Sequence, residues 1–153
     1  MHLRTIVGAG VLAATLIGCS SVPRQSDPGT IGNRAAQHAL DMQGKPYRYG
    51  GNTPRGFDCS GLVQYSYSLA GIDLPRSTEG LWKYSSAIAT RNLQPGDLLF
   101  FNQEGKRSSH VAIYVGRERF VHAPSTGKRV SIGNLDSAYW RRHLESVRRP
   151  FIQ

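Results

Sequence analysis

The sequence predicts an α+β fold in which N-terminal helices pack on an antiparallel β-sheet. Apolar residues recur at helical spacing in the first half of the 153-residue chain, as far as about residue 84. After Pro95 and Gly96 the pattern changes to short β-rich runs separated by glycine, charged residues or proline. Helices followed by a series of hairpin-linked strands are typical of α+β domains. The chain length suits one domain with a modest core.

Residues 1–18 have the features of an export signal and are not expected to belong to the fold. A short basic start precedes an uncharged apolar segment, residues 5–17, which is shorter than the roughly 20 residues of a membrane span. The segment ends in Leu16-Ile17-Gly18-Cys19, which resembles the lipobox of bacterial lipoproteins. That resemblance implies a Cys19 thiol that carries diacylglycerol and an acylated N-terminus. The alternative is an ordinary signal peptide with an incidental Cys19.

Residues 19–31 are therefore interpreted as a lipidated cysteine and a flexible tether, and residues 32–153 as the domain. The tether is rich in Ser, Pro, Asp and Gly and has no hydrophobic period. An acylated Cys19 has no free thiol for a disulfide, which leaves Cys59, the other of the two cysteines, unpaired. An odd cysteine in an exported protein is a candidate reactive thiol.

The charge balance favours anionic partners. The chain has 19 Lys and Arg against 10 Asp and Glu, for a formal net charge of +9. Nucleic acid, phospholipid head groups or an acidic polymer would suit that charge, but export argues against nucleic acid. Because the basic residues are scattered, a solvated basic surface is the simplest interpretation. No P-loop, Rossmann fingerprint or zinc-finger spacing is present, so no cofactor is expected.

Three helices are expected before residue 85. The first covers roughly residues 33–42. The second begins near Cys59, because Cys59, Leu62, Val63, Ser66 and Ala70 follow helical spacing and form one apolar stripe. Gly71 follows that stripe where a left-handed cap is needed. A short helix is expected around residues 78–84.

The strands are expected in the second half of the chain, and the tail beyond residue 136 is predicted as a short helix followed by a last edge segment. The β-rich runs are 98–101, 110–116, 119–124 and 129–135.

The candidate chemistry combines Cys59 with two histidines. A helix N-terminus lowers a thiol pKa and offers N–H groups to an oxyanion. Asp58 is expected to cap the second helix, and Ser60 to keep its first turn uncrowded. His110 and His122 lie in neighbouring strand runs, where a base and its orienting partner can lie side by side. A two-residue turn would instead pair His122 with Ile113, on the face opposite to His110, unless a bulge corrects the register.

Other interpretations of these residues stay open at this point. A lone cysteine on an apolar stripe is often a core residue, and a strand histidine is often structural. Zinc is not expected, because Cys59, His110 and His122 have no fourth ligand at a recognisable spacing.

The region from residue 33 to the end resembles the NlpC/P60 family of cell-wall cysteine peptidases, most closely its small lipoprotein members. The motifs that carry the resemblance occur in order along the chain. They are Tyr47-Arg48-Tyr49-Gly50-Gly51, Asp58-Cys59-Ser60-Gly61-Leu62-Val63, Leu74-Pro75-Arg76-Ser77, Pro95-Gly96-Asp97-Leu98, His110-Val111-Ala112-Ile113-Tyr114-Val115-Gly116 and Phe120-Val121-His122-Ala123.

The resemblance implies a papain-like α+β fold and a set of residue roles. Cys59 would be the nucleophile, His110 the general base and acid, and His122 the residue that orients His110. Tyr47 would lie beside the nucleophile.

The implied activity is hydrolysis of a stem-peptide amide in peptidoglycan, usually between γ-D-glutamate and meso-diaminopimelate. Arg48, Arg55 or Arg76 would pair with stem carboxylates. The implied location is the outer membrane, lipid-anchored and facing the periplasm, because Ser20 rather than aspartate follows Cys19. A monomer is expected, although no sequence feature addresses oligomeric state. The rivals are a non-enzymatic wall-binding lipoprotein with an inert Cys59, and a related cell-wall amidase or acyltransferase.

Overall fold

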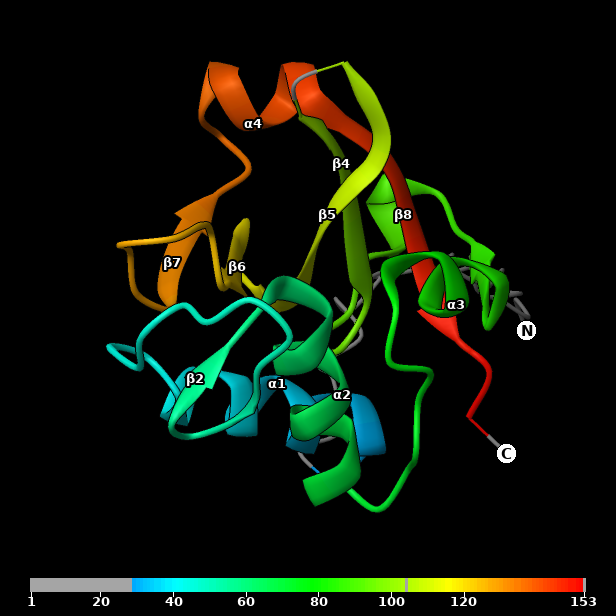
Figure 1. Cartoon of the computed structure of the whole chain (residues 1–153). Helices are drawn as coiled ribbons and strands as arrows, with labels where there is room; N and C mark the ends of the chain where they lie inside the picture. Colours follow the sequence, from blue (N-terminus) through cyan, green and yellow to red (C-terminus); the bar gives the residue numbers. More distant parts are fainter. Residues whose placement is uncertain (1–28, 104, 153) are drawn as a thin grey trace, which may run out of the picture.

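The computed structural model describes residues 29–103 and 105–152. It contains the predicted helices followed by an antiparallel sheet, so the α+β class is confirmed (Figure 1). The helical segments are α1 (Ile31–Asp41), α2 (Cys59–Leu69), α3 (Thr78–Lys83), the 3₁₀ turn η1 (Thr90–Asn92) and α4 (Ala138–His143). The strands are β1 (Asn52–Thr53), β2 (Gly56–Phe57), β3 (Ser85–Ala87), β4 (Leu98–Gln103), β5 (Lys106–Gly116), β6 (Arg119–His122), β7 (Ser131–Asn134) and β8 (Leu144–Pro150).

The main sheet has the strand order β3-β8-β4-β5-β6-β7, and every neighbouring pair in it is antiparallel. The prediction that the tail ends as an edge segment is therefore wrong, because β8 pairs with β3 on one side and β4 on the other. Its charged residues find partners inside the fold. Arg149 forms an ion pair with the buried Asp97 at 2.7 Å, and Arg148 lies 4.3 Å from the centre of the Trp82 ring.

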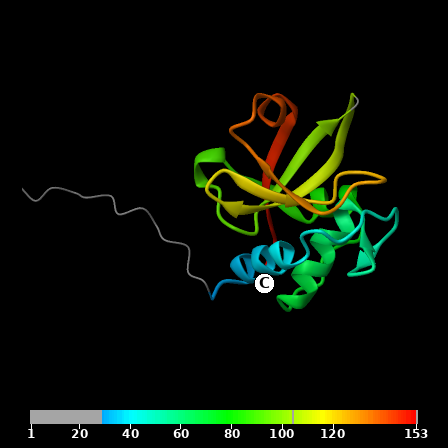
Figure 2. The same ribbon diagram turned by 90° about the vertical axis from the view of Figure 1, so that its left-hand side faces the viewer.

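One face of the sheet is covered by α1 and α2, as the two views of the ribbon show (Figures 1 and 2). Helix α1 contributes three alanines, which allow close approach, and α2 contributes larger apolar side chains. The buried residues at this interface include Ala35, Ala36, Ala39, Leu62, Val63, Tyr67, Phe100, Val111, Ile113 and Val121. This face contains the larger part of the apolar core.

The opposite face of the sheet carries a second, smaller core beneath α4. Alternate residues of the same strands point into it, because side chains along a strand alternate between faces. The buried members are Leu99, Phe101, Ala112, Tyr114, Phe120, Leu135 and Val147, with Trp140 of α4 packed against them. Both faces of β4 are therefore covered, which explains its unbroken apolar run from Leu98 to Phe101.

Helix boundaries follow local capping chemistry. The Thr30 side chain accepts a hydrogen bond from the Asn33 N–H and starts α1, and the Ser77 hydroxyl does the same for Gly80 in α3. Gly71 has a φ of +96°, so α2 ends with the predicted left-handed residue. None of the helices in the described part of the chain has the length and apolar character that crossing a membrane requires.

Candidate active site

Asp58 begins α2, as predicted. Its Oδ1 accepts a hydrogen bond from the Gly61 N–H at 2.7 Å, and its backbone oxygen accepts the one from Leu62 at 3.0 Å. Cys59 is thus the first residue of the helix, next to N–H groups that have no intrahelical acceptor. The cap fixes both the direction of the helix axis and the position of the thiol relative to it.

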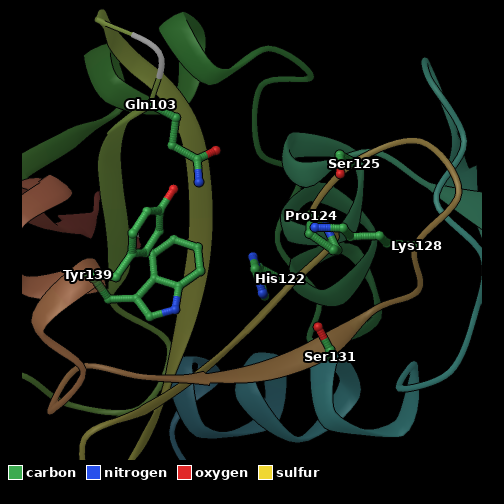
Figure 3. A pocket seen from close by; sticks show the side chains of 8 residues that line it. Gln103, His122, Pro124, Ser125, Lys128, Ser131 and Tyr139 are labelled. Atoms are coloured by element: carbon green, nitrogen blue, oxygen red, sulfur yellow. The ribbon is translucent and has the colours of Figure 1, made fainter.

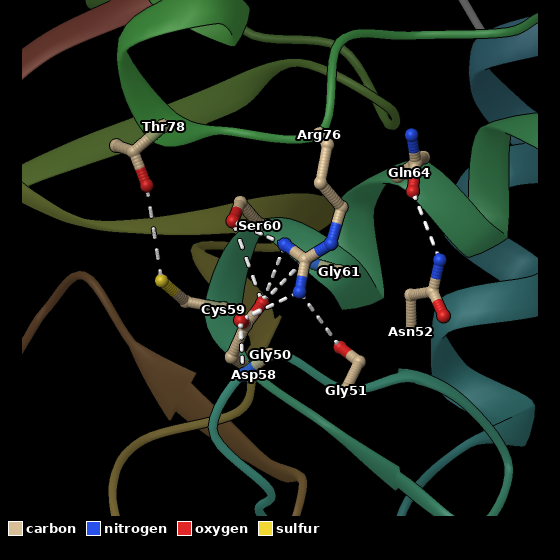
Figure 4. Close-up of polar contacts among 10 residues, drawn as sticks. All are labelled: Gly50, Gly51, Asn52, Asp58, Cys59, Ser60, Gly61, Gln64, Arg76 and Thr78. Carbon is tan, nitrogen blue, oxygen red and sulfur yellow. Dashed lines mark hydrogen bonds and ion pairs between the residues drawn. The ribbon is translucent and has the colours of Figure 1, made fainter.

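The Asp58 carboxylate also binds Arg76, in the loop before α3, and Gly50, in the loop before β1 (Figure 4). The Arg76 guanidinium donates to both carboxylate oxygens at 2.9 and 2.7 Å, and the Gly50 N–H donates to Oδ2 at 2.9 Å. Arg76 also donates to the Ser60 hydroxyl at 2.9 Å. Bidentate charge-assisted hydrogen bonds of this kind are strong and directional. Three segments are therefore held together around Cys59.

Gly61 has to be glycine because α2 passes very close to the backbone of Gly51. A Cβ atom at position 61 would lie 2.0 Å from the Gly51 oxygen and 2.9 Å from Asp58 Oδ1. The Gly51 backbone oxygen also accepts a hydrogen bond from the Asp58 N–H at 3.0 Å. The predicted uncrowded first turn is thus a contact between helix and loop that any larger residue would disrupt.

The Cys59 thiol is half-buried and has several polar neighbours. Sγ lies 4.0 Å from the Thr78 hydroxyl (Figure 4), and backbone groups of Val111 and Ser60 hydrogen-bond to it. Burial raises the pKa of the thiol, the negative charge of Asp58 raises it further, and these hydrogen bonds oppose the rise. The expectation that the helix terminus would lower this pKa is therefore wrong in the unliganded protein, because desolvation of the thiolate is the larger effect.

A β-bulge brings His110 and His122 to the same face of the sheet. Gly116 pairs with Arg119, but Tyr114 pairs with Phe120, so Val115 is an extra residue on β5. The connecting residues 117 and 118 both have positive φ, as in the tight turns of hairpins. The register shift moves His122 from the Ile113 face to the face of His110. The register objection to a joint site is thereby removed.

The two histidines, hereafter the histidine pair, are hydrogen-bonded. His110 Nε2 lies 2.9 Å from His122 Nδ1, and the rings are close to perpendicular, at 74°. Both side chains are buried, and burial is the main cause of the fall of the His110 pKa to about 3 and of the His122 pKa to about 4. The interaction with His122 lowers the His110 pKa further, and the positive charge of Lys128 lowers the His122 pKa further. Both rings are therefore neutral near pH 7.

The other ring nitrogen of His110, Nδ1, has no hydrogen-bond partner among the described residues. No fully buried side-chain nitrogen or oxygen in the described part of the chain lacks a partner, so this nitrogen retains some exposure. A neutral histidine whose Nε2–H donates to His122 has a lone pair at Nδ1. His110 is thus arranged to accept a proton there.

The histidine pair lies against Trp140 of α4, which sequence reasoning did not identify. The Trp140 ring centre is 5.1 Å from that of His122 and 6.3 Å from that of His110. Phe101 and Phe120 complete the aromatic surroundings, with ring centres 4.8 and 5.0 Å from that of Trp140. The apolar surroundings are the physical cause of the lowered histidine pKa values. The only signal in the sequence was an aromatic pair in the weakly patterned tail.

An open cleft of about 540 Å³, hereafter the Cys59 cleft, lies beside α2. Its lining includes Tyr47, Asp58, Cys59, Arg76, Thr78 and Ser109. Tyr47 is half-buried, and burial, together with the neighbouring Cys59 and Asp58 side chains, raises the pKa of its phenol. Of these residues, Thr78 and Ser109 were not identified from the sequence, because neither belongs to a pattern that distinguishes a site from a surface.

The structure brings the predicted residues together in two groups. Cys59, Asp58, Ser60, Arg76 and Tyr47 line or support the Cys59 cleft, while the histidine pair lies on the adjoining strands. The groups meet where Cys59 contacts the Val111 backbone, one residue after His110. Within the described residues, no hydrogen bond joins Cys59 Sγ to an imidazole. The Cys59 thiol points towards Thr78 instead (Figure 4). Cys19, the predicted lipidation site, lies outside the described residues.

A half-buried cysteine at a helix N-terminus, packed against an antiparallel sheet that carries a histidine pair, places this domain in the papain-like α+β class. The sequence profile of the NlpC/P60 family matches residues 44–149. The chain belongs to the NlpC/P60 family.

Individual proteins agree with that assignment. The chain is 41% identical over 140 residues to a Gamma-DL-glutamyl hydrolase of Bacillus subtilis, covering 90% of this chain and 33% of the relative. It is 44% identical over 122 residues to the Murein DD-endopeptidase MepH of Escherichia coli, covering 76% of this chain and 45% of the relative. The chain thus spans less than half the length of these two relatives.

A crystal structure of an NLP/P60 family protein from Staphylococcus aureus, described as similar to a lipoprotein, has the same fold. The TM-score is 0.73 at 37% identity, and the match covers 88% of this chain and 45% of that one.

Proposed function

We propose that this chain is a cysteine-type endopeptidase that hydrolyses amide bonds in the stem peptides of peptidoglycan. The observation that carries the proposal is the position of Cys59 at the start of α2, against the strand that bears His110, with the His110–His122 hydrogen bond of 2.9 Å. Membership of the NlpC/P60 family and the names of the two murein- and glutamyl-directed relatives support the substrate class.

Acylation begins with transfer of the thiol proton to His110 Nδ1 as Sγ attacks the scissile carbonyl carbon. The thiol has to rotate away from Thr78 for this step, a side-chain motion that substrate binding would accompany. Because both groups are neutral at rest, the base removes the proton during attack and no thiolate–imidazolium pair is formed beforehand. The imidazolium then gives its proton to the leaving amine as the C–N bond breaks, which leaves a thioester.

Deacylation reverses the roles with water. His110 Nδ1 accepts a proton from a water molecule that attacks the thioester carbonyl, and the proton passes to Sγ as the C–S bond breaks. The products are a free carboxylic acid and the regenerated thiol. His122 Nδ1 accepts the His110 Nε2–H throughout, which fixes the ring orientation and stabilises the imidazolium.

The oxyanion of both tetrahedral intermediates would be held by the first turn of α2. The Gly61 and Leu62 N–H groups donate to Asp58, which leaves that of Cys59 for another acceptor, and the Ser60 N–H becomes available when the thiol turns towards the substrate. The rigid cap around Asp58 and Arg76 maintains their direction. Preorganised donors of this kind need no reorientation during the reaction.

We further propose that the scissile bond joins γ-D-glutamate to meso-diaminopimelate. The B. subtilis relative, which matches 90% of this chain, is named a Gamma-DL-glutamyl hydrolase and supports this choice. The E. coli relative is named a DD-endopeptidase, so cleavage of the cross-link is the second candidate. The location in this proposal is the outer membrane, with a lipid anchor at Cys19 and the domain facing the periplasm.

Digestion of purified sacculi by the full chain in detergent, followed by mass spectrometry of the soluble and the muramidase-released fragments, tests the proposal. Cleavage after glutamate leaves glycan-linked stems that end at that residue, whereas DD-cleavage converts cross-linked dimers to monomers with intact stems. The absence of either change, with a folded protein, would favour the wall-binding module. Release of whole stems from the glycan would favour the amidase.

A further inference from the structure

A second pocket is lined by His122 of the histidine pair, and neither Asp58 nor Arg76 belongs to its lining. Its volume is about 440 Å³, and we call it the histidine-side pocket (Figure 3). Its lining includes Gln103 of β4, His122 of β6, Ser125 and Lys128 of the β6–β7 loop, and Tyr139 and Trp140 of α4. Figure 3 shows His122 between the Tyr139 side chain on one side and Ser125 with Lys128 on the other.

Hydrogen bonds link the lining of the histidine-side pocket to the Cys59 cleft and to His110. His122, which lines the pocket, hydrogen-bonds to His110 at 2.9 Å. Gln103, also in the pocket, is hydrogen-bonded through its N–H to the hydroxyl of Ser109, which lines the Cys59 cleft, at 2.9 Å. A substrate longer than one residue would therefore pass from one hollow to the other across the histidine pair.

The chemistry of amide cleavage assigns a side to each hollow. The acyl carbon has to meet Sγ and the N–H groups of α2, which border the Cys59 cleft. The leaving amine has to receive a proton from His110, so the residue that carries this amine lies on the histidine side of the thiol. Of the two hollows, the histidine-side pocket is the one whose lining includes a histidine.

The two hollows differ in whether their basic side chain is free to bind a substrate carboxylate. In the Cys59 cleft, both terminal nitrogens of Arg76 are already bonded to the Asp58 carboxylate. Lys128 is exposed and has no ion-pair partner among the described residues. None of the residues that the structure places in the lining of the histidine-side pocket is acidic. A carboxylate of the substrate would therefore find an unpaired cation at Lys128 and not at Arg76.

We propose that the histidine-side pocket binds the residue on the amine side of the scissile bond and that Lys128 selects a free carboxylate on it. Meso-diaminopimelate, with two amino and two carboxyl groups, is a residue of this class, whichever of its amines is released. Its aliphatic chain would pack along the Trp140 and Tyr139 rings, and Ser125 and Gln103 offer hydrogen bonds. The inference rests on the proposed endopeptidase function and adds the part of the substrate that the pocket recognises.

The test compares two stem peptides that differ only in this carboxylate, which is free in one and amidated in the other. The full chain in detergent is assayed as wild type, Lys128→Gln, Lys128→Arg and Arg91→Gln. Arg91 lies in η1 and is exposed, so Arg91→Gln removes the same charge away from both hollows. Initial rates give kcat/KM for each enzyme and peptide.

We expect wild type, Lys128→Arg and Arg91→Gln to prefer the free carboxylate by roughly five- to tenfold, the size of a partly exposed charged hydrogen bond. Lys128→Gln should lose this preference by slowing on the free carboxylate alone. Equal kinetics of Lys128→Gln and wild type would overturn the assignment. An equal loss of kcat/KM on both peptides would also overturn it. Such a loss would mean that Lys128 acts on His122 through its charge and does not recognise the substrate carboxylate. If wild type cleaves neither peptide, the endopeptidase function itself fails.

Discussion

The direction of the hydrogen bond between His110 and His122 determines what His122 has to be. In the proposed mechanism His110 needs its Nδ1 lone pair for the thiol proton, so its Nε2 carries hydrogen and His122 Nδ1 has to accept. A protonated His122 cannot accept at Nδ1. Burial, aided by the Lys128 charge, lowers the His122 pKa to about 4 and keeps this ring neutral. In the proposed mechanism, the aromatic surroundings therefore act by keeping the orienting residue, His122, in its neutral form.

Cys59→Ala is expected to abolish muropeptide release. No thioester can form without the sulfur, and a water molecule cannot replace the acylated thiol intermediate. Because Cys59 is half-buried at a helix start, the free energy of unfolding should change by no more than about 1 kcal/mol. Mass spectrometry of digested sacculi and a urea unfolding curve measure the two effects. Cys59→Ser should be nearly inactive as well. Release by Cys59→Ala at the wild-type rate would exclude Cys59 as the nucleophile.

At position 122, an acceptor should matter more than an imidazole. We expect His122→Asn or His122→Gln to keep measurable activity, because an amide oxygen can accept the His110 Nε2–H. His122→Ala should lose about 100-fold, since a misdirected ring displaces the reacting atoms. His110→Ala should be the least active, because that residue transfers protons in both half-reactions. Initial rates of muropeptide release establish the order. Wild-type rates for His122→Ala would show that another residue orients His110.

At the scale of elements, three segments depend on one carboxylate. Asp58 caps α2, receives the Gly50 N–H and binds the Arg76 fork. The Arg76 and Ser60 side chains are also linked, so the loop before α3 and the first turn of α2 move together. This explains why the cation that sequence reasoning offered to the substrate is engaged within the protein. Arg48 and Arg55 remain exposed candidates on the loop around β1 and β2.

Arg76→Lys is expected to lower both stability and activity. A lysine ammonium cannot reproduce the two parallel hydrogen bonds to Asp58 or the one to Ser60, so we expect a loss of about 1–2 kcal/mol. The matched control is Arg107→Lys, at an ion pair with Glu145 whose arginine side chain is 84% exposed, where little change is expected. Urea unfolding and initial rates measure both variants. Equal effects at the two sites would argue against the anchoring role of Asp58.

The helices and strands were predictable from the sequence because their signals are local. The helical stripe of Cys59, Leu62 and Val63, the cap at Asp58 and the glycine at residue 71 each act within one or two turns. The bulge at Val115 leaves no such signal, because Val115 fits the alternating pattern of β5 as well as its neighbours do. The joint site of His110 and His122 depends on that one extra residue. Its position follows from pairing with β6.

Non-local pairing also explains the errors in the tail. The charges of Arg148 and Arg149 favoured an edge strand. In the structure Arg148 lies over the Trp82 ring and Arg149 forms an ion pair with Asp97, and both partners are more than 50 residues away in sequence. Trp140 and Lys128 were missed for the same reason, since only the folded sheet brings α4 and the β6–β7 loop to opposite sides of His122. The pKa of Cys59 depended on the depth of burial, which no local pattern reports.

At the scale of the whole molecule, the proposed anchor and the catalytic domain should be separable. Cys19→Ala is expected to leave the protein unlipidated and absent from the outer-membrane fraction. Its rate on isolated peptidoglycan in solution should equal that of wild type, because residue 19 is far in sequence from Cys59 and the histidine pair. Membrane fractionation and muropeptide release measure the two properties. A Cys19→Ala protein that still fractionates with the outer membrane would contradict the lipobox interpretation.

The histidine pair also links the stability of the whole domain to pH. An unfolded histidine has a pKa near 6.5, whereas burial lowers the folded-state pKa to about 3 for His110 and about 4 for His122. Between pH 6.5 and 4 the unfolded chain therefore binds more protons than the folded one. The stabilising contribution of the pair is complete above pH 6.5 and is lost as the pH falls towards 4. Each histidine that stays neutral contributes up to about 1.4 kcal/mol per pH unit to that loss.

We therefore expect the free energy of unfolding of wild type to fall between pH 7 and pH 5. The fall should be shallower for His122→Asn, which removes one of the two proton-binding sites from the unfolded chain. Urea unfolding followed by tryptophan fluorescence at pH 7, 6 and 5 measures the slopes, and comparison of the two proteins cancels the contribution of the carboxylates. Because kcat/KM reports the free enzyme, its acid limb should also lie below pH 6.5. Identical slopes for wild type and His122→Asn would mean that folding does not lower the pKa of His122, and the conclusion that burial keeps its Nδ1 free to accept would then be wrong.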